Sequence, residues 1–575
     1  MQSAWRQYFI YSIVAIAFIF ILARIILLQG FNTDCFIFNL DKCKTNLSEI
    51  AEKRQIASRS IDTNRGTIFD RNNEILAMSL PRKTLCINPS LLYNLKKEDL
   101  KKYHPLLEII GEKKSNFLKI VKKFNKRKEY YLRRKVSDKT ALKIEKLNLK
   151  FVYFIKEYQR VYLGGESFSN VLGFTDIDDI GQEGIELSKD DVLSSTKGIK
   201  KIRKDNLGRA IETIEIIKQP IAGQDIKLAL DKNIQIIGYN ILKKYVDKFS
   251  AESASLILIR NKTGEIISMA NYPSFNPDLR HEMSGTKIKN RIITEIIEPG
   301  STMKPFLIFA ALNSEEFSKE DIVDTTPGFI RIGGKIIKDP SNYGKLSLGE
   351  IIERSSNIGA IRVAQQLEKK DLWENIKLFQ FGDNLYTGLS GEQHGELKHH
   401  SAWDDSQQAT IGYGYGISTT LLHLCNAYTI LANHGKYIPL TYEKIEDISS
   451  IYKEEIVDED LSKEIIGFMT RVVQNKNGTG KRANLEKYTV AGKTGTARIF
   501  IKGKYADDKH LALFVGIVPA SNPQYVAAIM VKNPNKGNAS GGKNAAPIFK
   551  EFMSQALTLL KVYPDRKILK NEKTK

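Results

Sequence analysis

A serine and a lysine three residues apart, at the start of an apolar run, most constrain how this chain can fold. The segment Glu298–Pro305 (Glu-Pro-Gly-Ser-Thr-Met-Lys-Pro) leads directly into the apolar run Phe306–Leu312. Pro-Gly is a turn signal, and the apolar run predicts a buried helix. Since proline is tolerated only in the first turn of a helix, we expect Ser301 at the helix N-terminus. Residues i and i+3 share a helix face, so Lys304 can reach the Ser301 hydroxyl.

This pair has the residue types of an activated nucleophile. A serine hydroxyl attacks poorly until a neighbouring group takes its proton, and a desolvated, neutral lysine can do so. The same spacing occurs at Ser194–Lys197, Ser284–Lys287 and Ser540–Lys543, where an exposed polar surface is the simpler interpretation. The Pro-Gly entry, the buried helix and two motifs further along the chain distinguish the pair at Ser301.

The second motif is Ser355-Ser356-Asn357, which lies between two predicted helices at residues 348–354 and 358–367. A hydroxyl and an amide two residues apart in a loop can both face a cleft, where one relays a proton and the other binds a substrate amide. The alternative is a helix N-cap, for which serine and asparagine are favoured.

The third motif is Lys493-Thr494-Gly495-Thr496, which continues a predicted strand that begins at Tyr488. Glycine in a strand lets another backbone lie alongside. We expect a fixed positive charge from Lys493 and a hydroxyl from Thr496, both suited to binding a carboxylate. The same letters at residues 262–264 fall in a predicted hairpin turn, which we interpret as a turn only.

The N-terminus carries a candidate membrane segment. Residues 7–23 contain no charged side chain, and an apolar run continues at residues 25–28. About 20 such residues cross a bilayer as a helix. We therefore predict a cytoplasmic tail and an uncleaved signal-anchor within residues 1–30, with the rest of the chain outside the cytoplasm. A cleaved signal peptide is the alternative.

Charge and cysteine content limit the remaining functional classes. The net charge of +21 could indicate a nucleic-acid partner, but basic runs with interleaved aromatic residues are sparse and no nucleic-acid module is recognisable. We therefore expect no nucleic-acid partner. The four cysteines show no CxxC metal spacing, and we expect neither a metal nor a cofactor. Cys35 and Cys43 could pair in an oxidising compartment or stay as free thiols.

Changes of pattern along the chain predict its domains. Residues 48–223 form a separate non-catalytic module, the pedestal, with a hairpin at residues 65–77 and a lysine-rich helical middle. Residues 224–556 contain strands near both ends and helices between them, which indicates one antiparallel sheet covered by helices, an α/β (α+β) fold. Residues 557–575 form a polar tail. The strands are expected at residues 226–230, 254–259, 265–270, 511–518 and 525–531, and a helix at residues 231–245.

Taken in order, the three motifs resemble the signature of the penicillin-recognising serine enzymes. The segments Arg65-Gly66 with Asp70-Arg71, residues 181–186 (Gly-Gln-Glu-Gly-Ile-Glu) and residues 412–416 (Gly-Tyr-Gly-Tyr-Gly) resemble those of class B penicillin-binding proteins. Within that class, Glu-Pro-Gly-Ser looks like the septal, FtsI-type enzymes, whereas the elongation type more often has Pro-Pro-Gly-Ser. The implied fold is the β-lactamase-like penicillin-binding transpeptidase fold, behind a transmembrane helix and a pedestal.

The resemblance implies a peptidoglycan D,D-transpeptidase that attacks D-Ala-D-Ala stem peptides and is inhibited by β-lactams. Ser301 would form the acyl-enzyme with Lys304 as base. Ser355 would relay the proton, and Asn357 would orient the substrate amide. The terminal carboxylate would be held by Lys493, Thr494, Gly495 and Thr496. A septal glycan polymerase, other division proteins and the inner membrane are the implied partners.

Several alternatives stay open at this stage. A soluble β-lactamase would need neither anchor nor pedestal, and a bifunctional enzyme would need a polymerase domain for which residues 30–64 leave no room. A catalytically silent β-lactam sensor or scaffold, and an elongation-type transpeptidase of the lateral wall, are the remaining alternatives. The stem-peptide chemistry, the acceptor amine and the extent of carboxypeptidase activity do not follow from the residues.

Overall fold

Two compact units, interleaved in the sequence, make up the chain. The computed structural model describes residues 2–30, 56–204, 210–279, 283, 285–501, 504–534 and 539–566. Unit 1 comprises residues 1–65, 79–159 and 195–223, and unit 2 comprises residues 66–78, 160–194 and 224–575. Parts of the predicted 48–223 module therefore pack within unit 2. We describe each unit by itself.

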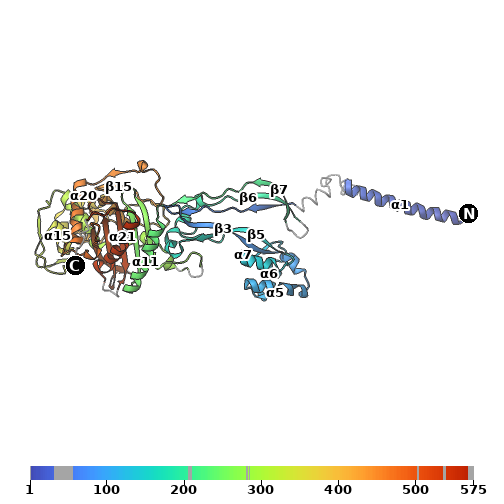
Figure 1. Cartoon of the computed structure of the whole chain (residues 1–575), viewed down its shortest axis with the longest axis horizontal. Helices are drawn as coiled ribbons and strands as arrows, with labels where there is room; N and C mark the ends of the chain where they lie inside the picture. The colour runs from blue at the N-terminus through green and yellow to red at the C-terminus, as the bar shows by residue number, and fades with distance from the viewer. Residues whose placement is uncertain are drawn as a thin grey trace, which may run out of the picture. The chain divides into compact units, whose positions relative to one another are not determined.

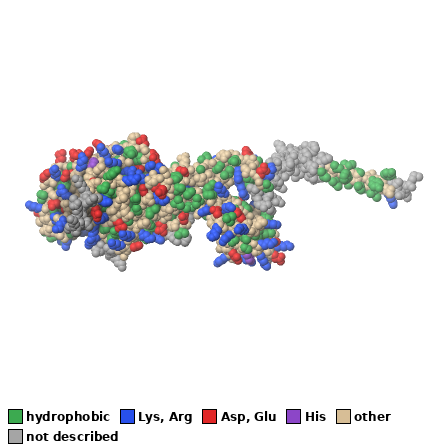
Figure 2. All heavy atoms as spheres, viewed as in Figure 1, with side chains coloured by type: hydrophobic (Ala, Val, Ile, Leu, Met, Phe, Trp, Pro, Cys, Tyr) green, Lys and Arg blue, Asp and Glu red, His purple; other side chains and the backbone are tan. Residues whose placement is uncertain are grey.

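The chain starts with the apolar helix α1 (Gln2–Gly30). Its segment Trp5–Ala23 is long and apolar enough to cross a membrane, and none of it is buried against the protein. Figure 2 shows apolar side chains along this helix. The predicted pair Cys35 and Cys43 lies outside the described residues.

Unit 1 contains an antiparallel sheet with the strand order β1-β6-β7 (Figure 1). These strands are β1 (Ile56–Ile61), β6 (Gly198–Lys204) and β7 (Ala210–Lys218). In the same unit, the second half of β3 (Ile75–Ile87) pairs with β4 (Tyr130–Val136), and β5 (Val152–Tyr162) follows. The helices α3 (Pro89–Tyr93), α4 (Lys97–Leu100), α5 (His104–Ile110), α6 (Lys114–Lys123) and α7 (Asp138–Glu145) complete it.

The helical spacing predicted in the lysine-rich middle is confirmed, since Phe117 and Val121 of α6 are both buried. They join Leu85, Leu106 and Ile144 in a compact apolar core. The lysines of α6 lie on its solvent face, so an ordinary amphipathic helix accounts for that charge.

Unit 2 is built on a five-stranded antiparallel sheet with the order β10-β9-β19-β18-β17. Its strands are β9 (Ser253–Arg260), β10 (Glu265–Tyr272), β17 (Ala491–Ile501), β18 (Lys504–Val518) and β19 (Tyr525–Lys532). The early hairpin β9–β10 joins the late strands through β19. This arrangement confirms the predicted sheet assembled from both ends of the segment.

Successive side chains of these strands point to opposite faces of the sheet and enter two different apolar cores. Both faces are therefore apolar, and helices cover each of them (Figure 1). Ala512 and Phe514 face the core that contains α11 (Lys232–Phe249) and α21 (Ala546–Leu559). Leu511 and Leu513 face the opposite core. That second core is filled by α14 (Lys304–Asn313), α16 (Asn357–Gln366), α19 (Leu421–Ala432) and α20 (Glu459–Gln474). The predicted fold class, an antiparallel sheet flanked by helices, is confirmed.

Smaller elements surround these cores. The hairpin predicted at residues 65–77 is confirmed as β2 paired with β3. The elements of this group are β2 (Ile68–Phe69), β8 (Ile226–Lys227), α8 (Ser169–Leu172), α9 (Gly184–Ser188), α10 (Asp190–Leu193), α12 (Gly285–Ile288), α13 (Arg291–Thr294), β11 (Ile322–Asp324), β12 (Phe329–Ile332), β13 (Lys335–Lys338), β14 (Lys345–Ser347), α15 (Leu348–Arg354), α17 (Lys369–Leu378) and α18 (Asp405–Ile411).

Three boundaries differ from the prediction. The strand predicted at residues 226–230 stops at Lys227, because Asp231 caps α11 and the chain turns into that helix. The strand predicted from Tyr488 begins at Ala491. At the C-terminus the ordered chain continues past residue 556, since the Tyr488 hydroxyl donates to the Val562 carbonyl at 2.9 Å. Residues 567–575 of the predicted tail lie outside the described residues.

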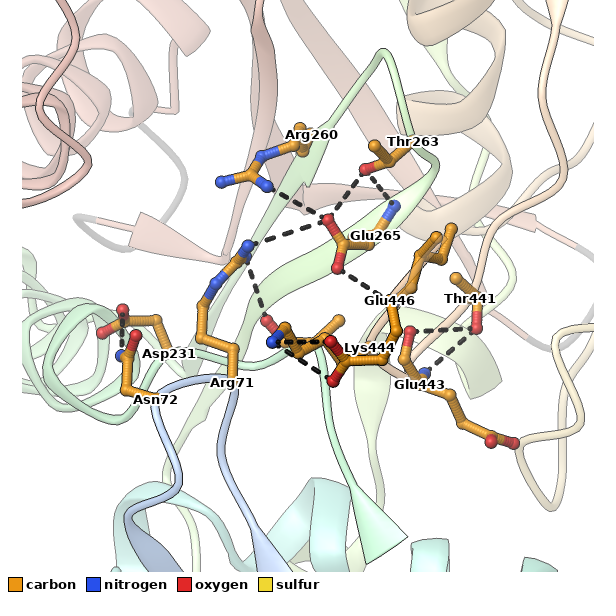
Figure 3. Close-up of polar contacts among 12 residues, drawn as sticks. Arg71, Asn72, Asp231, Arg260, Thr263, Glu265, Thr441, Glu443, Lys444 and Glu446 are labelled. Atoms are coloured by element: carbon orange, nitrogen blue, oxygen red, sulfur yellow. Dashed lines mark hydrogen bonds and ion pairs between the residues drawn. The ribbon is translucent and has the colours of Figure 1, made fainter. Parts of the chain in front are cut away.

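A buried ionic cluster joins β9 and β10 to the loop after β2 (Figure 3). The Glu265 side chain is 2% exposed, and its Oε2 lies 3.2 Å from Nη1 of Arg260 and 3.7 Å from Nη2 of Arg71. The Thr263 hydroxyl donates to the same oxygen at 2.9 Å. Thr263 belongs to the second Lys-Thr-Gly sequence, and its place in the β9–β10 turn confirms that this copy is a turn.

Candidate active site

Ser301 lies in a tight turn that leads into a buried helix. Residues Gly300–Met303 form one turn of 3-10 helix, and α14 continues from Lys304 with Pro305 in its first turn. Gly300 has a φ of +55°, a conformation that favours glycine, and its N–H donates to the Gly414 carbonyl at 3.0 Å. The predicted position of Ser301 at the helix N-terminus is confirmed.

Lys304 is buried beside the serine. Its Nζ lies 3.1 Å from Ser301 Oγ, 2.8 Å from Asn357 Oδ1 and 2.7 Å from the Ser355 carbonyl oxygen. Burial lowers the pKa of Lys304 to about 7, although the nearby Asp339 carboxylate opposes the shift. A large fraction of Lys304 is therefore neutral at neutral pH and able to accept a proton.

Lys493 lies behind Ser355 rather than on the surface of the site. Its Nζ is 2.9 Å from Ser355 Oγ and 3.2 Å from the Thr494 carbonyl oxygen, and the side chain is fully buried. Burial, and next the charge of Lys304, lower the pKa of Lys493 well below its usual value. Burial therefore disfavours the positive charge that we expected on Lys493. A bound carboxylate would favour the charged form again.

Ser355 is the residue that connects the two lysines. Its Oγ lies 3.3 Å from Lys304 Nζ and 2.9 Å from Lys493 Nζ. Its φ of 59° places it in the left-handed region at the end of α15, an uncommon conformation for serine that is often found at functional sites. The N-cap alternative applies instead to its neighbour Ser356, which caps α16.

A buried carboxylate that sequence reasoning missed holds this turn. Asp339 accepts hydrogen bonds from Ser356 Oγ and from the Asn357 backbone N–H, both at 2.5 Å. It follows β13, and nothing in its sequence context distinguishes it from a turn residue before proline. The carboxylate orients the turn that carries Ser355 and Asn357, so we assign it a positioning role.

The Lys493–Thr496 segment lies on β17, the edge strand of the five-stranded sheet. A Cβ on Gly495 would lie 2.9 Å from Thr302 Cγ2 and 3.1 Å from the Pro299 carbonyl oxygen. Glycine is therefore required for the serine turn to approach the strand. Thr496 is exposed, and its Oγ1 accepts a hydrogen bond from the Gly541 N–H at 3.2 Å.

A cavity of about 950 Å³ opens at these residues. Ser301, Ser355 and Asn357 line it together with Thr494, Gly495 and Thr496, whereas Lys304 and Lys493 do not. All eight predicted site residues thus gather at one place, six on the cavity wall and two lysines behind it.

One wall of the cavity is aromatic and was not predicted as part of the site. Tyr413, Tyr415 and Tyr505 line it. Glu298, three residues before the serine, accepts hydrogen bonds from the Tyr505 hydroxyl at 2.9 Å and from the Gly416 N–H at 3.0 Å. Burial raises the pKa of Glu298.

Two family models match the chain. The penicillin binding protein transpeptidase domain matches residues 254–554, and the penicillin-binding protein dimerisation domain matches residues 60–228.

Curated relatives match over nearly the whole length. The chain is 34% identical over 572 residues to peptidoglycan D,D-transpeptidase FtsI of Buchnera aphidicola subsp. Schizaphis graminum, covering 99% of this chain and 97% of that protein. It is 30% identical over 567 residues to FtsI of Escherichia coli K12, covering 98% and 93%. The probable peptidoglycan D,D-transpeptidase PenA of Neisseria meningitidis is 31% identical over 570 residues, covering 98% and 94%.

Solved structures agree. The transpeptidase domain of Burkholderia pseudomallei penicillin-binding protein 3 has a TM-score of 0.54 at 33% identity, covering 59% of this chain and 98% of that one. Penicillin-binding protein 3 of Mycobacterium tuberculosis, complexed with aztreonam, has a TM-score of 0.67 at 24% identity, covering 89% and 99%, and supports the fold. This chain therefore belongs to the class B penicillin-binding proteins, the family of the FtsI-type serine peptidoglycan D,D-transpeptidases.

Proposed function

We propose that the protein cross-links peptidoglycan stem peptides at the division septum through an acyl-enzyme on Ser301. The observation that carries this proposal is the contact of 3.1 Å between Ser301 Oγ and a buried lysine whose pKa is lowered to about 7. Few structural settings make a lysine neutral beside a serine hydroxyl, and nucleophilic activation is the chemistry that such a pair supports.

In the first half-reaction, Ser301 Oγ attacks the carbonyl carbon of the penultimate D-alanine, and its proton passes to neutral Lys304. The C–N bond to the terminal D-alanine then breaks. Ser355 Oγ gives its proton to the leaving amine and regains one from a lysine, since both Lys304 and Lys493 lie within 3.3 Å of it. The products are an ester on Ser301 and free D-alanine.

In the second half-reaction, an amine of a neighbouring stem attacks the ester carbonyl carbon. The amine loses one proton to neutral Lys304, the ester C–O bond breaks, Lys304 passes that proton to Ser301 Oγ, and an amide cross-link forms. We assign the oxyanion hole to the backbone N–H groups of Ser301 and Thr496, each donor contributing about 3–4 kcal/mol of transition-state stabilisation. Asn357 would orient the substrate amide.

The terminal carboxylate of the substrate is assigned to the Lys493–Thr496 segment. Thr494 and Thr496 line the cavity, and the Lys493 ammonium lies behind them. Binding a carboxylate there would raise the pKa of Lys493 and so restore its charge when the substrate arrives. β-Lactams would enter as mimics of the dipeptide and acylate the same serine.

The remaining expectations are retained as proposals. Residues 1–30 would anchor the protein in the inner membrane as a single-pass signal-anchor, with the rest of the chain on the periplasmic side. Residues 48–223 would serve as the pedestal, residues 224–556 as the transpeptidase domain and residues 557–575 as the tail. A septal glycan polymerase and other division proteins would be its partners.

Mass spectrometry of the penicillin adduct tests the nucleophile. We expect the intact protein to gain the mass of one penicillin, located on the peptide that contains Ser301, and Ser301→Ala to gain none. An unmodified wild-type protein would leave only the scaffold interpretation. Depletion in cells tests the site of action: filaments would support the septal role, and round cells would support the elongation alternative.

A further inference from the structure

The helical part of unit 1 carries most of the charge imbalance of the chain. Residues 89–150 contain 19 lysines and arginines against 7 aspartates and glutamates, whereas the whole remainder of the chain contains 68 against 59. Residues 113–128, which comprise α6, its N-cap and the loop that follows, hold eight cations and no acidic residue. We call these residues the basic segment. A lysine-rich composition shared by the whole chain does not explain such a local excess.

The charges of the basic segment are accessible and unpaired. Its eight cations are all exposed, namely Lys113, Lys114, Lys119, Lys122, Lys123, Lys126, Arg127 and Lys128. Figure 2 shows basic side chains gathered over the part of unit 1 that carries α6. Among the described residues, the ion pairs of unit 1 involve other cations, such as Arg59, Lys83 and Lys102, and none involves these eight. Even with the flanking Glu112 and Glu129 included, the net charge is +6.

Helix stability does not account for the sign of these charges. Amphipathicity explains why polar side chains lie on the solvent face of α6, and a mixture of both signs would serve that purpose equally well. Lys122 and Lys123 in the last turn complement the helix dipole. Lys113 at the N-cap and Lys114 in the first turn lie at the opposite end, where cations are unfavourable, and no acidic residue accompanies them. The excess of cations therefore indicates a role other than folding.

The buried side of α6 determines which side chains face outward. Phe117 and Val121 pack in the apolar core of unit 1. Lys114, Leu118 and Lys122 follow one another at i, i+4 spacing and are all exposed, Leu118 by 39%. An apolar side chain thus lies between two cations on the solvent face of the helix.

The loop after α6 continues this surface. The Lys123 Nζ lies 5.3 Å and the Arg127 Cζ 4.9 Å from the centre of the Phe124 ring, which stacks on Tyr130 at 4.8 Å. Cation–π contacts of this kind hold a cation against the ring. Because both side chains contact one ring, the charge of the helix extends into the loop.

We propose that the basic segment docks on the acidic phospholipids of the membrane in which residues 1–30 are anchored. Its cations would bind lipid phosphates, and Leu118 would enter the boundary between headgroups and acyl chains. An anionic glycan would satisfy the charges but offers no apolar phase for the leucine. The anchor keeps the bilayer at a high effective concentration. The inference goes beyond the proposed function, from which it takes only the membrane anchor.

A fluorescent probe at position 118 tests the docking. The full-length protein with Cys35→Ser, Cys43→Ser and Leu118→Cys is labelled with NBD, since the remaining Cys86 and Cys425 are buried. It is placed in nanodiscs of phosphatidylcholine, with or without about 30% phosphatidylglycerol, that contain doxyl-labelled lipid as quencher. We expect quenching only in the acidic discs, and its loss in about 1 M salt, where the screening length falls to roughly 3 Å.

A charge variant and a second probe position locate the effect. Lys114→Gln, Lys119→Gln, Lys122→Gln and Lys123→Gln together should lower the ratio of docked to undocked protein about a hundredfold or more, since each cation near an acidic surface strengthens binding about fivefold. The same probe at Leu559→Cys, a leucine of unit 2 that is 47% exposed, should stay unquenched in both discs. Thermal unfolding checks that each variant is folded.

A second variant controls for net charge. It replaces four exposed lysines of unit 2 by glutamine, namely Lys398, Lys453, Lys476 and Lys550. Its net charge equals that of the first variant, so quenching at position 118 should match that of the protein with all its lysines.

The outcomes separate this inference from the proposed function. Equal quenching in both kinds of disc, quenching that persists in the basic-segment variant, or no quenching in any disc overturns the inference. A shift in emission on addition of solubilised glycan strands of peptidoglycan, without quenching by lipid, assigns the segment to the wall polymer instead and also overturns it. In each case a protein that still forms the Ser301 penicillin adduct leaves the proposed function intact.

Discussion

Two charged clusters in the described part of unit 2 differ in how their charges are balanced. In the cluster of Figure 3, the Glu265 carboxylate lies between the guanidinium groups of Arg71 and Arg260. In the cluster at Ser301, two ammonium groups share the Ser355 hydroxyl, and no described carboxylate forms an ion pair with either. The first arrangement pairs opposite charges and links β9 and β10 to the loop after β2. The second brings two cationic side chains together, and both lysine pKa values are lowered.

The difference shows how burial produces either stability or reactivity. A buried charge with a close partner of opposite sign stays ionised, and removing one partner is strongly destabilising. A buried cation without such a partner tends to lose its proton instead. Burial of the two lysines at Ser301 therefore lowers the free energy of unfolding, and it also provides a base that is largely neutral near physiological pH.

The largest expected effect comes from replacing the base. Lys304→Met should slow acylation of Ser301 by penicillin about 10³-fold or more, because among the described residues only Lys304 contacts the hydroxyl as a proton acceptor. The same variant should unfold at an equal or higher temperature, since it replaces a desolvated amine by an apolar side chain. Stopped-flow acylation and thermal unfolding measure the two quantities. A variant that loses stability along with activity would break the comparison.

In the Glu265 cluster we expect a large loss of stability and little change in the acylation rate. Glu265→Gln should lower the free energy of unfolding by about 3 kcal/mol, because it leaves two guanidinium groups without their carboxylate. The acylation rate of the folded protein should change less than about twofold. Glu446→Gln is the control, since Glu446 is 66% exposed and its ion pairs are of the weak surface kind. Equal destabilisation by both variants would contradict the prediction.

An intermediate effect is expected at the positioning carboxylate. Asp339→Asn keeps the shape but weakens the hydrogen bonds to Ser356 and Asn357, so acylation should fall on the order of tenfold to a hundredfold. The pH–rate profile separates this role from a merely structural one. Without the carboxylate, which raises the Lys304 pKa, the midpoint of the profile should move to lower pH. An unchanged midpoint would argue against the coupling.

The pH dependence of the wild type tests the same lysine without any substitution. Acylation needs neutral Lys304, so its rate should rise about tenfold per pH unit below 7 and level off above it. The free energy of unfolding also depends on the protonation of Lys304, but over a different pH range. Because the folded protein binds fewer protons than the unfolded chain between pH 7 and about 10.5, the free energy of unfolding should rise across that range. A rate that is flat from pH 5 to 9 would contradict Lys304 as the base.

Local pattern determined much of what this protein is. The three motifs, the hairpins at residues 65–77 and 254–270, and the helices around Ser355 follow from periodicity, turn residues and caps, which act within a few residues. The same local signals identified Ser301 and Lys304 among several decoys, because a Pro-Gly turn before a buried helix is visible in the chain itself.

Only the tertiary structure decided the rest. Asp339, Glu298 and the tyrosines of the cavity wall have no distinctive local pattern, and they join the site because distant segments fold onto it. The pKa of a lysine likewise depends on burial and on neighbours far away in sequence, so the lowered pKa of Lys493 could not be seen beforehand. Residue order specifies which groups exist, whereas desolvation and charge balance, set by packing, decide what those groups do.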